Sequence, residues 1–282
     1  MDDKLENEIK CLDKGFVRLV DVMGDDSSIV QAARVSYGKG TKTVNEDRGL
    51  IRYLMRHKHT TPFEMVEFKF HVKLPIFVAR QWIRHRTANV NEYSGRYSEM
   101  KDEFYLPSTE QIRTQSVINK QGRADETLPS EHTAEILDST QAHYETSFEL
   151  YQSLLEKGLT RELSRMVLPV ANYTEWYWKI DLHNLFHFLK LRLDTHAQYE
   201  IRVYAEAMAE LVKAIVPLAW EAYEHYMLNS IMLTQGELSI LADMLPPTEL
   251  DVEQCLKYGL SKREAGEFVD KYNKIKKLSS NE

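Results

Sequence analysis

The stretch EFKFHVKLPIFVARQWIRHR, residues 67–86, gives the clearest prediction of secondary structure in the chain. Its first half alternates between apolar and polar or charged side chains, and the apolar ones are Phe68, Phe70, Val72 and Leu74. This period is typical of a β-strand with one face in a core and the other partly wet. Pro75 suits the first position of a helix, and helical spacing follows it. We therefore predict a strand over residues 67–74 that leads directly into a helix.

Further strands and helices surround this unit. Alternation predicts strands at residues 16–23 and 174–180. Helical periodicity predicts helices over residues 47–58, 136–158, 181–193 and about 196–215, with others after Asp25, Thr160 and Pro217. A late helix begins at the capping-box pattern Ser261 to Glu264. The fold class is therefore α+β and helix-rich.

The chain divides near residue 235. Residues 107–133 are polar and predict a surface excursion within the first part. From Gly236 the sequence contains Pro246-Pro247 and the late helix. We expect one domain over residues 1–235 and a helical C-terminal extension over residues 236–282, without a role assigned to the extension.

Composition narrows the function. The chain has 282 residues, 43% of them apolar, and a net charge of −7 from 36 basic and 43 acidic side chains. That balance argues against a nucleic-acid or anionic-membrane binder. The two cysteines, Cys11 and Cys255, are far apart and predict no disulfide framework. A charged N-terminus without an apolar signal core, and no apolar run of membrane-spanning length, predict a cytoplasmic protein.

An arginine cluster stands out against this acidic background. The segment RHRTANVNEYSGRYS, residues 84–98, contains three arginines and no lysine, and Arg80 lies one turn upstream. Guanidinium groups are planar, forked donors that match phosphate and carboxylate oxygens. We therefore expect a site for small anionic ligands here.

Several common motifs are missing or incomplete. There is no GxGxxG, and GKGTKT at residues 38–43 lacks the Walker spacing. His183 and His187 have the spacing of a helical metal pair, but Asn184 replaces the expected Glu and no third ligand is evident, so we predict no metal site. Ser94 is either a nucleophile with His85 as its base, a hydroxyl that binds phosphate, or a turn serine. Phosphate binding is the functional role that we favour.

For two further arginines and several aromatic side chains, the sequence allows both a structural and a functional role. Arg165 and Arg192 lie among apolar neighbours, where a charge is expensive to bury. Each forms either an internal salt bridge, for Arg192 with Asp194 or Glu200, or an anion site. Aromatic side chains near the cluster either stack on a flat ring or pack in the core; they are Trp82, Tyr93, Tyr97 and Trp176.

These residues resemble one known family. Arg84-His85-Arg86, then seven residues, then Ser94 is similar to the RHR-x7-S signature of the flavin-dependent thymidylate synthases. The resemblance runs from about Phe16 to about Tyr226. It includes TPFE at 61–64, FVARQWIRHR at 77–86, NEYSGRYS at 91–98, SRMVLP at 164–169 and LRLDTHAQYEIR at 191–202.

The resemblance implies a fold, an activity and an assembly. Members of this family have a mostly antiparallel sheet flanked by long helices. They methylate dUMP to dTMP with methylenetetrahydrofolate as the carbon donor, and FAD reduced by NADPH supplies the hydride. They are homotetramers with active sites shared between subunits. A flavin route also agrees with the two cysteines lying outside every motif, since the unrelated synthase without flavin uses a cysteine nucleophile.

The resemblance also implies residue roles. FAD contacts fall on Thr61, Arg84, His85, Arg86 and Glu92, and on the variable family positions Asp181, His183 and His187. dUMP contacts fall on Gln81 and Arg84 from a neighbouring subunit, on Glu92, Tyr93, Ser94, Gly95 and Arg96, and on Arg165 and Arg192. Arg192 is the expected catalytic residue, a fixed cation that favours ionisation of the pyrimidine at N3. His59 and Tyr97 resemble positions on the folate and nicotinamide side.

Two alternatives use the same arginine pocket. The first is a non-catalytic nucleotide- or RNA-binding module, which salt-dependent RNA binding without a flavin would support. The second is a flavoprotein that oxidises NADPH without a pyrimidine substrate. Binding of dUMP that changes the flavin spectrum would exclude the second.

Overall fold

The computed structural model describes residues 8–35, 43–117, 120, 122–245 and 249–278. The GKGTKT stretch, apart from Thr43, and the Pro246-Pro247 pair lie outside these residues. The chain forms two compact units, Met1–Leu228 and Asn229–Glu282.

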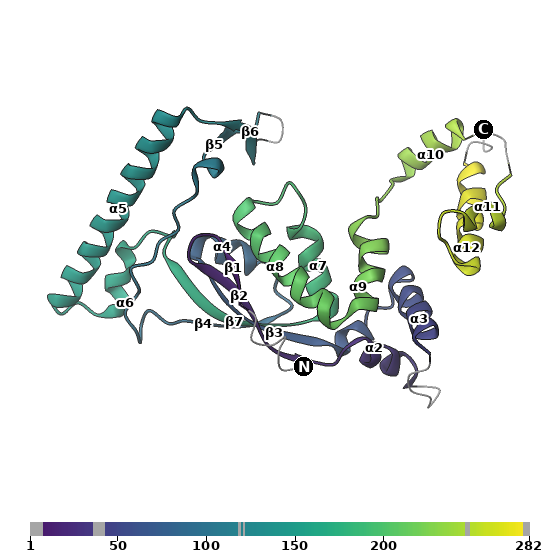
Figure 1. The fold of residues 1–282 in the computed structure, drawn as a ribbon, viewed down its shortest axis with the longest axis horizontal. Coiled ribbons are helices and arrows are strands. Elements are labelled where there is room, and N and C mark those ends of the chain that lie inside the picture. The colour runs from purple at the N-terminus through teal and green to yellow at the C-terminus, as the bar shows by residue number, and fades with distance from the viewer. Residues whose placement is uncertain (1–7, 36–42, 118–119, 121, 246–248, 279–282) are drawn as a thin grey trace. The chain divides into compact units, whose positions relative to one another are not determined.

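The larger unit is built on a five-stranded antiparallel sheet with the order β1-β2-β3-β7-β4 (Figure 1). Its strands are β1 (Glu8–Cys11), β2 (Gly15–Met23), β3 (Glu67–Pro75), β4 (Asn89–Glu92) and β7 (Tyr173–Asp181). β3 and β7 pair along their whole length, from Glu67 opposite Asp181 to Pro75 opposite Tyr173. The three strands predicted from alternation are confirmed.

One face of this sheet forms the core. The four apolar side chains of the β3 alternation are fully buried, whereas the lysines and histidine between them lie half-buried on the other face. Trp176 and Trp178 of β7 face the same core, and Trp82 meets them edge-to-face at centroid distances of 5.6 and 5.2 Å. Buried aromatic and aliphatic side chains of this kind contribute ~1.5–3 kcal/mol each. Trp82 and Trp176 are therefore core residues, not stacking platforms.

Helices α4 (Ile76–Trp82), α7 (Leu182–Arg192) and α8 (Tyr199–Ile215) cover the core face (Figure 1). α4 follows β3 directly, with Pro75 just before its first residue. α7 follows β7 directly, and Asp181 caps it by accepting a hydrogen bond from the Asn184 N–H at 2.9 Å. Because β3 and β7 are antiparallel, the two helices leave opposite ends of the sheet, and the chain after α4 meets the end of α7.

The helix after β3 is short. It ends at Trp82, so Arg84 and Arg86 lie beyond its last turn rather than on it. Strand β4 follows and pairs with the edge of β7, from Asn89 opposite Lys179 to Glu92 opposite Trp176. All four β4 residues are exposed, so the strand has no apolar alternation from which it could be predicted.

Other helices complete the larger unit. They are α2 (Asp26–Ala33), α3 (Val44–Arg56), α5 (Ser130–Glu156), α6 (Arg161–Ser164), α9 (Pro217–Tyr223), the 3-10 turns η2 (Phe63–Met65), η3 (Thr109–Gln111) and η4 (Arg165–Val167), and the π turn η5 (Glu224–Leu228). The polar excursion contains a small antiparallel pair, β5 (Arg113–Gln115) and β6 (Arg123–Thr127). α5 begins within the stretch predicted as excursion, at Ser130 rather than at residue 136.

The smaller unit contains α10 (Gln235–Met244), α11 (Val252–Leu256) and α12 (Lys262–Lys276). α12 begins at the predicted capping box, in which Ser261 and Glu264 bond each other's backbone N–H. Ala242, Cys255 and Ala265 are its buried apolar side chains among the described residues. The unit boundary lies near the predicted one, and the assignment of a catalytic domain and an extension stays a prediction.

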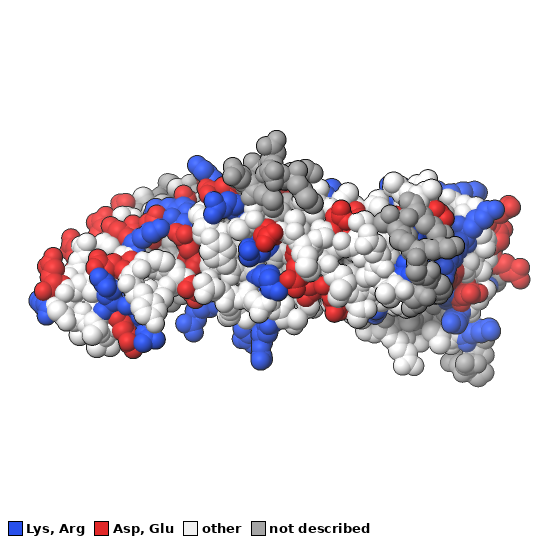
Figure 2. Space-filling view, turned by 90° about the horizontal axis from the view of Figure 1, so that it is seen from below, with Lys and Arg blue, Asp and Glu red and all other residues white. Residues whose placement is uncertain are grey.

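In the segments that the structure describes, no helix is both long and apolar enough to cross a membrane. On the face drawn in Figure 2, basic and acidic side chains are interspersed.

Candidate active site

A cavity of about 390 Å³ lies where the chain after α4 meets the end of β7 and the last turns of α7. Its lining residues are Arg84, His85, Arg86, Thr87, Ile180, Asn184, His187, Leu191 and Arg192. Among described residues, its ionisable lining is arginine and histidine, with no carboxylate. The sequence predicted every arginine and histidine of this set but not Thr87 or Asn184, whose short polar side chains carry no signal of their own.

His85 and Arg192 are in direct contact. Arg192 Nε donates a hydrogen bond to His85 Nε2 at 3.1 Å. Because that nitrogen accepts, the imidazole is neutral and carries its proton on Nδ1. Burial, followed by the charges of Arg192 and His187, lowers the pKa of His85 to about 4, so the ring stays neutral near pH 7. The terminal N–H groups of Arg192 remain for a ligand in the cavity.

The carboxylates considered as partners of Arg192 bind elsewhere. Asp194 contacts the His196 backbone N–H and imidazole, each at 2.8 Å, and Glu200 pairs with Arg123. Of the two interpretations of Arg192, the internal salt bridge with Asp194 or Glu200 is therefore wrong. Since no carboxylate of the described residues pairs with Arg192, this half-buried cation beside a neutral ring favours an incoming anion.

The arginines near α4 also lack carboxylate partners among the described residues. Arg80, Arg84 and Arg86 are exposed, and none of them forms an ion pair with a carboxylate in the described parts of the chain. Other arginines are paired: Arg96 lies 3.4 Å from Glu162. Unpaired guanidiniums around one cavity are suited to phosphate oxygens.

The Ser94 loop forms a second cluster with Arg165. A Cβ on Gly95 would lie 2.7 Å from the Met100 sulfur and 3.1 Å from Arg165 Cδ, so a larger residue there would have to displace these side chains. Arg165 itself is exposed and donates from Nε to the Glu162 carbonyl at 3.3 Å. The structure thus brings together Gly95 and Arg165, two predicted dUMP residues from distant motifs.

Strand β7 anchors this loop. Tyr93 N–H donates to the Glu175 carbonyl at 2.7 Å, and Thr174 Oγ1 donates to Glu92 at 2.8 Å. Ser94 Oγ accepts from the Arg96 N–H at 3.4 Å. Since His85 binds Arg192 instead, the structure does not form the Ser94–His85 nucleophile and base pair.

The two clusters are separate within one chain. The cavity lining includes neither the Ser94 loop nor Arg165. β4 runs between them, and its residues Asn89–Glu92 span ~10 Å at the usual rise of a strand. One chain therefore presents two part-sites.

Gln81 is oriented by a chain of hydrogen bonds that the sequence did not reveal. Glu200, 1% exposed, accepts from Arg123, from Tyr105 at 3.0 Å and from Gln198 at 2.8 Å. A carboxylate only accepts, so Gln198 gives it the amide N–H and offers its oxygen to Gln81. Gln81 consequently donates inward and keeps its own oxygen for a ligand. Burial alone would raise the pKa of Glu200, but Arg123 and Gln198 outweigh it and the net shift is downward.

The remaining predicted residues do not line the cavity. His59, Thr61 and Tyr97 are exposed, and His183 is half-buried on α7. The Asp181 carboxylate binds Asn184 Nδ2 at 2.7 Å besides capping the helix. In the described segments, no group of three or more His, Cys, Asp or Glu side chains could hold a metal ion.

Neither cysteine lies in the cavity. Cys11 is buried in β1, where burial raises its pKa to about 12. Cys255 is buried in α11 of the smaller unit. The Cys11 thiol, kept protonated by this raised pKa, is a poor nucleophile.

Comparison with known proteins shows which family the chain resembles. The family model of the thymidylate synthase complementing proteins matches residues 18–218. A flavin-dependent thymidylate synthase of Ehrlichia ruminantium strain Gardel is 54% identical over 270 residues, which cover 96% of this chain and 90% of that protein. The chain belongs to the flavin-dependent thymidylate synthase family. One from Treponema denticola is 56% identical over 241 residues, 86% of this chain and 91% of that protein.

A solved structure supports the family fold. The UMP/dUMP methylase PolB of Streptomyces cacaoi, bound with 5-Br dUMP, is 34% identical with a TM-score of 0.69. The match covers 77% of this chain and 98% of that one. Membership of this family makes the chain an enzyme, which decides against the non-catalytic module.

The cofactor of the family is FAD, and the donor set of this chain fits it. FAD carries a diphosphate, and the cavity offers guanidiniums without carboxylate partners. Thr87 and Asn184 add neutral hydrogen-bonding groups on the same wall. The predicted FAD contacts His85, Arg84, Arg86 and His187 would hold the cofactor there.

Proposed function

We propose that this protein converts dUMP to dTMP by reductive methylation, with methylenetetrahydrofolate as the carbon donor and NADPH as the reductant of FAD. The observation that carries the proposal is the Arg192 guanidinium, held by neutral His85 in a cavity lined by cations. Family membership, and the nucleotide named for the PolB structure, support dUMP as the substrate.

Arg192 supplies the electrostatic part of the mechanism. A pyrimidine ionised at N3 carries negative charge, which makes C5 nucleophilic toward the carbon donor. A fixed cation beside that charge stabilises it by ~3 kcal/mol in comparable sites. His85 keeps the guanidinium in place without adding a second positive charge. Bound FAD supplies hydride chemistry, which no side chain of the chain provides.

The two part-sites support a shared active site. The Ser94 loop and Arg165 present hydroxyl and guanidinium groups to the phosphate of dUMP, whereas Arg192 acts on its ring. Because one chain holds these groups apart, we propose that a neighbouring subunit completes each site in a homotetramer. We also propose a cytoplasmic location, which cell fractionation would check.

The first experiment is anaerobic dTMP formation from dUMP, methylenetetrahydrofolate, FAD and NADPH, with FAD omitted from a stripped control. We expect product that depends on FAD. UMP is tested beside dUMP, because PolB is named for both nucleotides. A protein that binds and reduces FAD but makes no dTMP would show that the proposed substrate is wrong.

Arg192→Ala tests the proposed role of the guanidinium. We expect loss of dTMP formation, with reduction of FAD by NADPH largely retained, because the cation acts on the pyrimidine. Arg202→Ala is the matched control, since Arg202 pairs with Glu206 on α8 at 3.5 Å, outside the cavity. Unchanged dTMP formation in Arg192→Ala would contradict the mechanism.

A further inference from the structure

Lys58, just after α3, has a left-handed backbone conformation with a φ of 58°. Its N–H donates to the Met55 carbonyl at 3.1 Å, and the N–H of His59 donates to the Leu54 carbonyl at 2.9 Å. This pair of bonds is the Schellman motif, whose left-handed position is usually glycine. A side chain with a Cβ is disfavoured there by contact with the backbone.

The same chain builds the same motif with glycine at the end of α5. Gly158 has a φ of 84°, and its N–H donates to the Leu155 carbonyl at 2.9 Å. The N–H of Leu159 donates to the Leu154 carbonyl at 3.0 Å. The turn itself therefore has no need of lysine.

Attraction to the negative end of the helix dipole does not explain Lys58 either. Arg56, in the last turn of α3, already supplies a cation from an ordinary helical position. At α5, Lys157 does the same one residue before the glycine. A strained lysine where glycine would serve is typical of a functional position.

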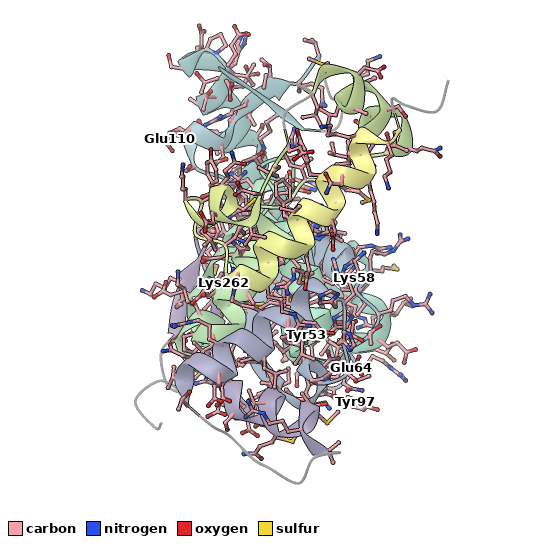
Figure 3. The ribbon with its side chains drawn as sticks, turned by 90° about the vertical axis from the view of Figure 1, so that its right-hand side faces the viewer. Tyr53, Lys58, Glu64, Tyr97, Glu110 and Lys262 are labelled. Carbon is pink, nitrogen blue, oxygen red and sulfur yellow. The ribbon has the colours of Figure 1, made fainter. Side chains whose placement is uncertain are left out.

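The surroundings of Lys58 are suited to an anion. Its side chain is exposed and makes no ion pair with a described residue. His57 and His59 on either side are exposed as well. Their rings lie 4.4 and 5.8 Å from the ring of Tyr53, which Figure 3 shows on the same flank as Lys58. The turn presents an ammonium group and imidazole nitrogens beside a flat ring.

This turn leads into the segment that borders α7. The Val66 carbonyl accepts a hydrogen bond from the Leu182 N–H at 2.8 Å, so η2 lies beside the first turn of α7. Arg192 ends that helix, ~15 Å further along its axis at 1.5 Å per residue. The turn with Lys58 therefore leads into a segment that packs against the helix carrying Arg192.

We infer that Lys58 binds the anionic tail of a co-substrate, a phosphate or carboxylate group. The two co-substrates of the proposed function carry such groups: the 2′-phosphate of NADPH and the glutamate of the folate. The identity of the ligand rests on the proposed function. The site itself rests on the geometry of the turn.

The test compares Lys58→Gly with the full-length wild type. Glycine removes the ammonium and relieves the left-handed conformation, so stability and ligand binding should change independently. We expect an unfolding temperature equal to or above that of the wild type. We also expect affinity for one co-substrate to fall about threefold to tenfold, as for loss of a charge-assisted contact. Lys157→Ala removes the exposed cation of the α5 turn and should leave co-substrate affinity unchanged, with at most a small fall in unfolding temperature from its lost attraction to the helix dipole.

Titration calorimetry with four probes distinguishes the two sources. They are NADP⁺, NAD⁺, and the monoglutamate and triglutamate of methylenetetrahydrofolate. Weaker binding of NADP⁺ with unchanged NAD⁺ assigns Lys58 to the 2′-phosphate. Weaker binding of the folates, most for the triglutamate, assigns it to carboxylates. Lys58→Asn, which also tolerates a left-handed conformation, repeats the comparison if the glycine variant fails to fold.

Unchanged affinity for all four probes would overturn the inference. Because binding is measured without turnover, this result is separate from failure of the proposed function. Failure of the function would appear as a wild type that binds the probes and forms no dTMP.

Discussion

His85 lies between two other basic side chains, Arg192 and His187, and its neutral ring holds the guanidinium by accepting a hydrogen bond. An acceptor at Nε2 matters because any cation there would repel Arg192. Glutamine can place its amide oxygen near the same point, whereas leucine cannot. Substituting His85 with glutamine or with leucine therefore separates the effect of the hydrogen-bond acceptor from the effect of the volume of the ring.

We expect His85→Leu to lower kcat for dTMP formation about tenfold to a hundredfold, the range for a lost hydrogen bond to a charged group. His85→Gln should lose less than about threefold, because the acceptor remains. FAD affinity is measured in both variants, since His85 is also a predicted FAD contact. Equal losses in the two variants would show that Arg192 does not depend on this acceptor.

The pKa of His85 also predicts how stability depends on pH. The folded protein keeps the ring neutral down to about pH 4, while the unfolded chain protonates it near pH 6.5. Between these values the unfolded state binds more protons, so this group lowers the free energy of unfolding as pH falls from about 6.5 to 4. Denaturant titrations across this range should show a shallower decline in His85→Gln. Parallel declines in the two proteins would contradict the low pKa.

For single residues, the sequence predicted which residue types belong to the site better than it predicted their contacts. Arg192 and His85 were both expected in the site, but 107 residues separate them and their hydrogen bond could not be foreseen. The partners considered for Arg192 were the nearby carboxylates Asp194 and Glu200. Local hydrogen bonds to His196 and a distant cation, Arg123, engage them instead.

Among the elements, the β5–β6 pair has a role that its polar composition concealed. It supplies Arg123 to the buried Glu200, which orients Gln198 and, through it, Gln81. Removing the cation leaves a buried carboxylate uncompensated, a costly change. The excursion is thereby tied to a predicted dUMP residue.

Arg123→Ala should lower the free energy of unfolding by about 2 kcal/mol, because Glu200 keeps its charge in the interior. It should also raise KM for dUMP a few-fold as Gln81 loses its orientation. Arg113→Ala is the matched control in the same element, since its contact with exposed Asp125 is 3.8 Å long, and we expect a change within about 0.5 kcal/mol. Denaturant unfolding and initial rates measure both effects.

Adding Glu200→Gln to Arg123→Ala should restore part of the lost stability, because the uncompensated charge is removed. A double variant no more stable than Arg123→Ala would indicate that packing of Arg123, not its charge, stabilises the excursion.

The strands illustrate why elements were predictable to different degrees. β3 and β7 bury one face, so apolar and polar side chains alternate along their sequences and predict the strands. β4 is exposed along its length and exists because the edge of β7 offers backbone partners. That strand places the Ser94 loop, so the layout of the site depended on an element without a sequence signal.

For the molecule as a whole, the separation of the part-sites is the main result. Motif order in a sequence does not say whether two motifs meet in one chain or between chains. Gly95 and Arg165 meet within the chain, whereas Arg192 lies with His85 in another place. That separation is what supports the proposal that neighbouring subunits share each site.

Mixing two inactive variants tests the shared site. Arg192→Ala and Arg165→Ala should each lose dTMP formation alone. After subunit exchange, a site has an even chance of drawing each intact arginine, so about one quarter of wild-type activity should return. Sedimentation confirms that mixed tetramers form. Mixed tetramers without activity would show that both arginines of a site come from one chain.

The burial of the two cysteines has a practical consequence. Each compact unit carries one of them: Cys11 in the larger and Cys255 in the smaller. Because both thiols are shielded from solvent in the native state, an alkylating reagent reaches each one only when its own unit opens. Mass spectrometry of briefly labelled protein would therefore time the opening of the two units independently, with no engineered probe.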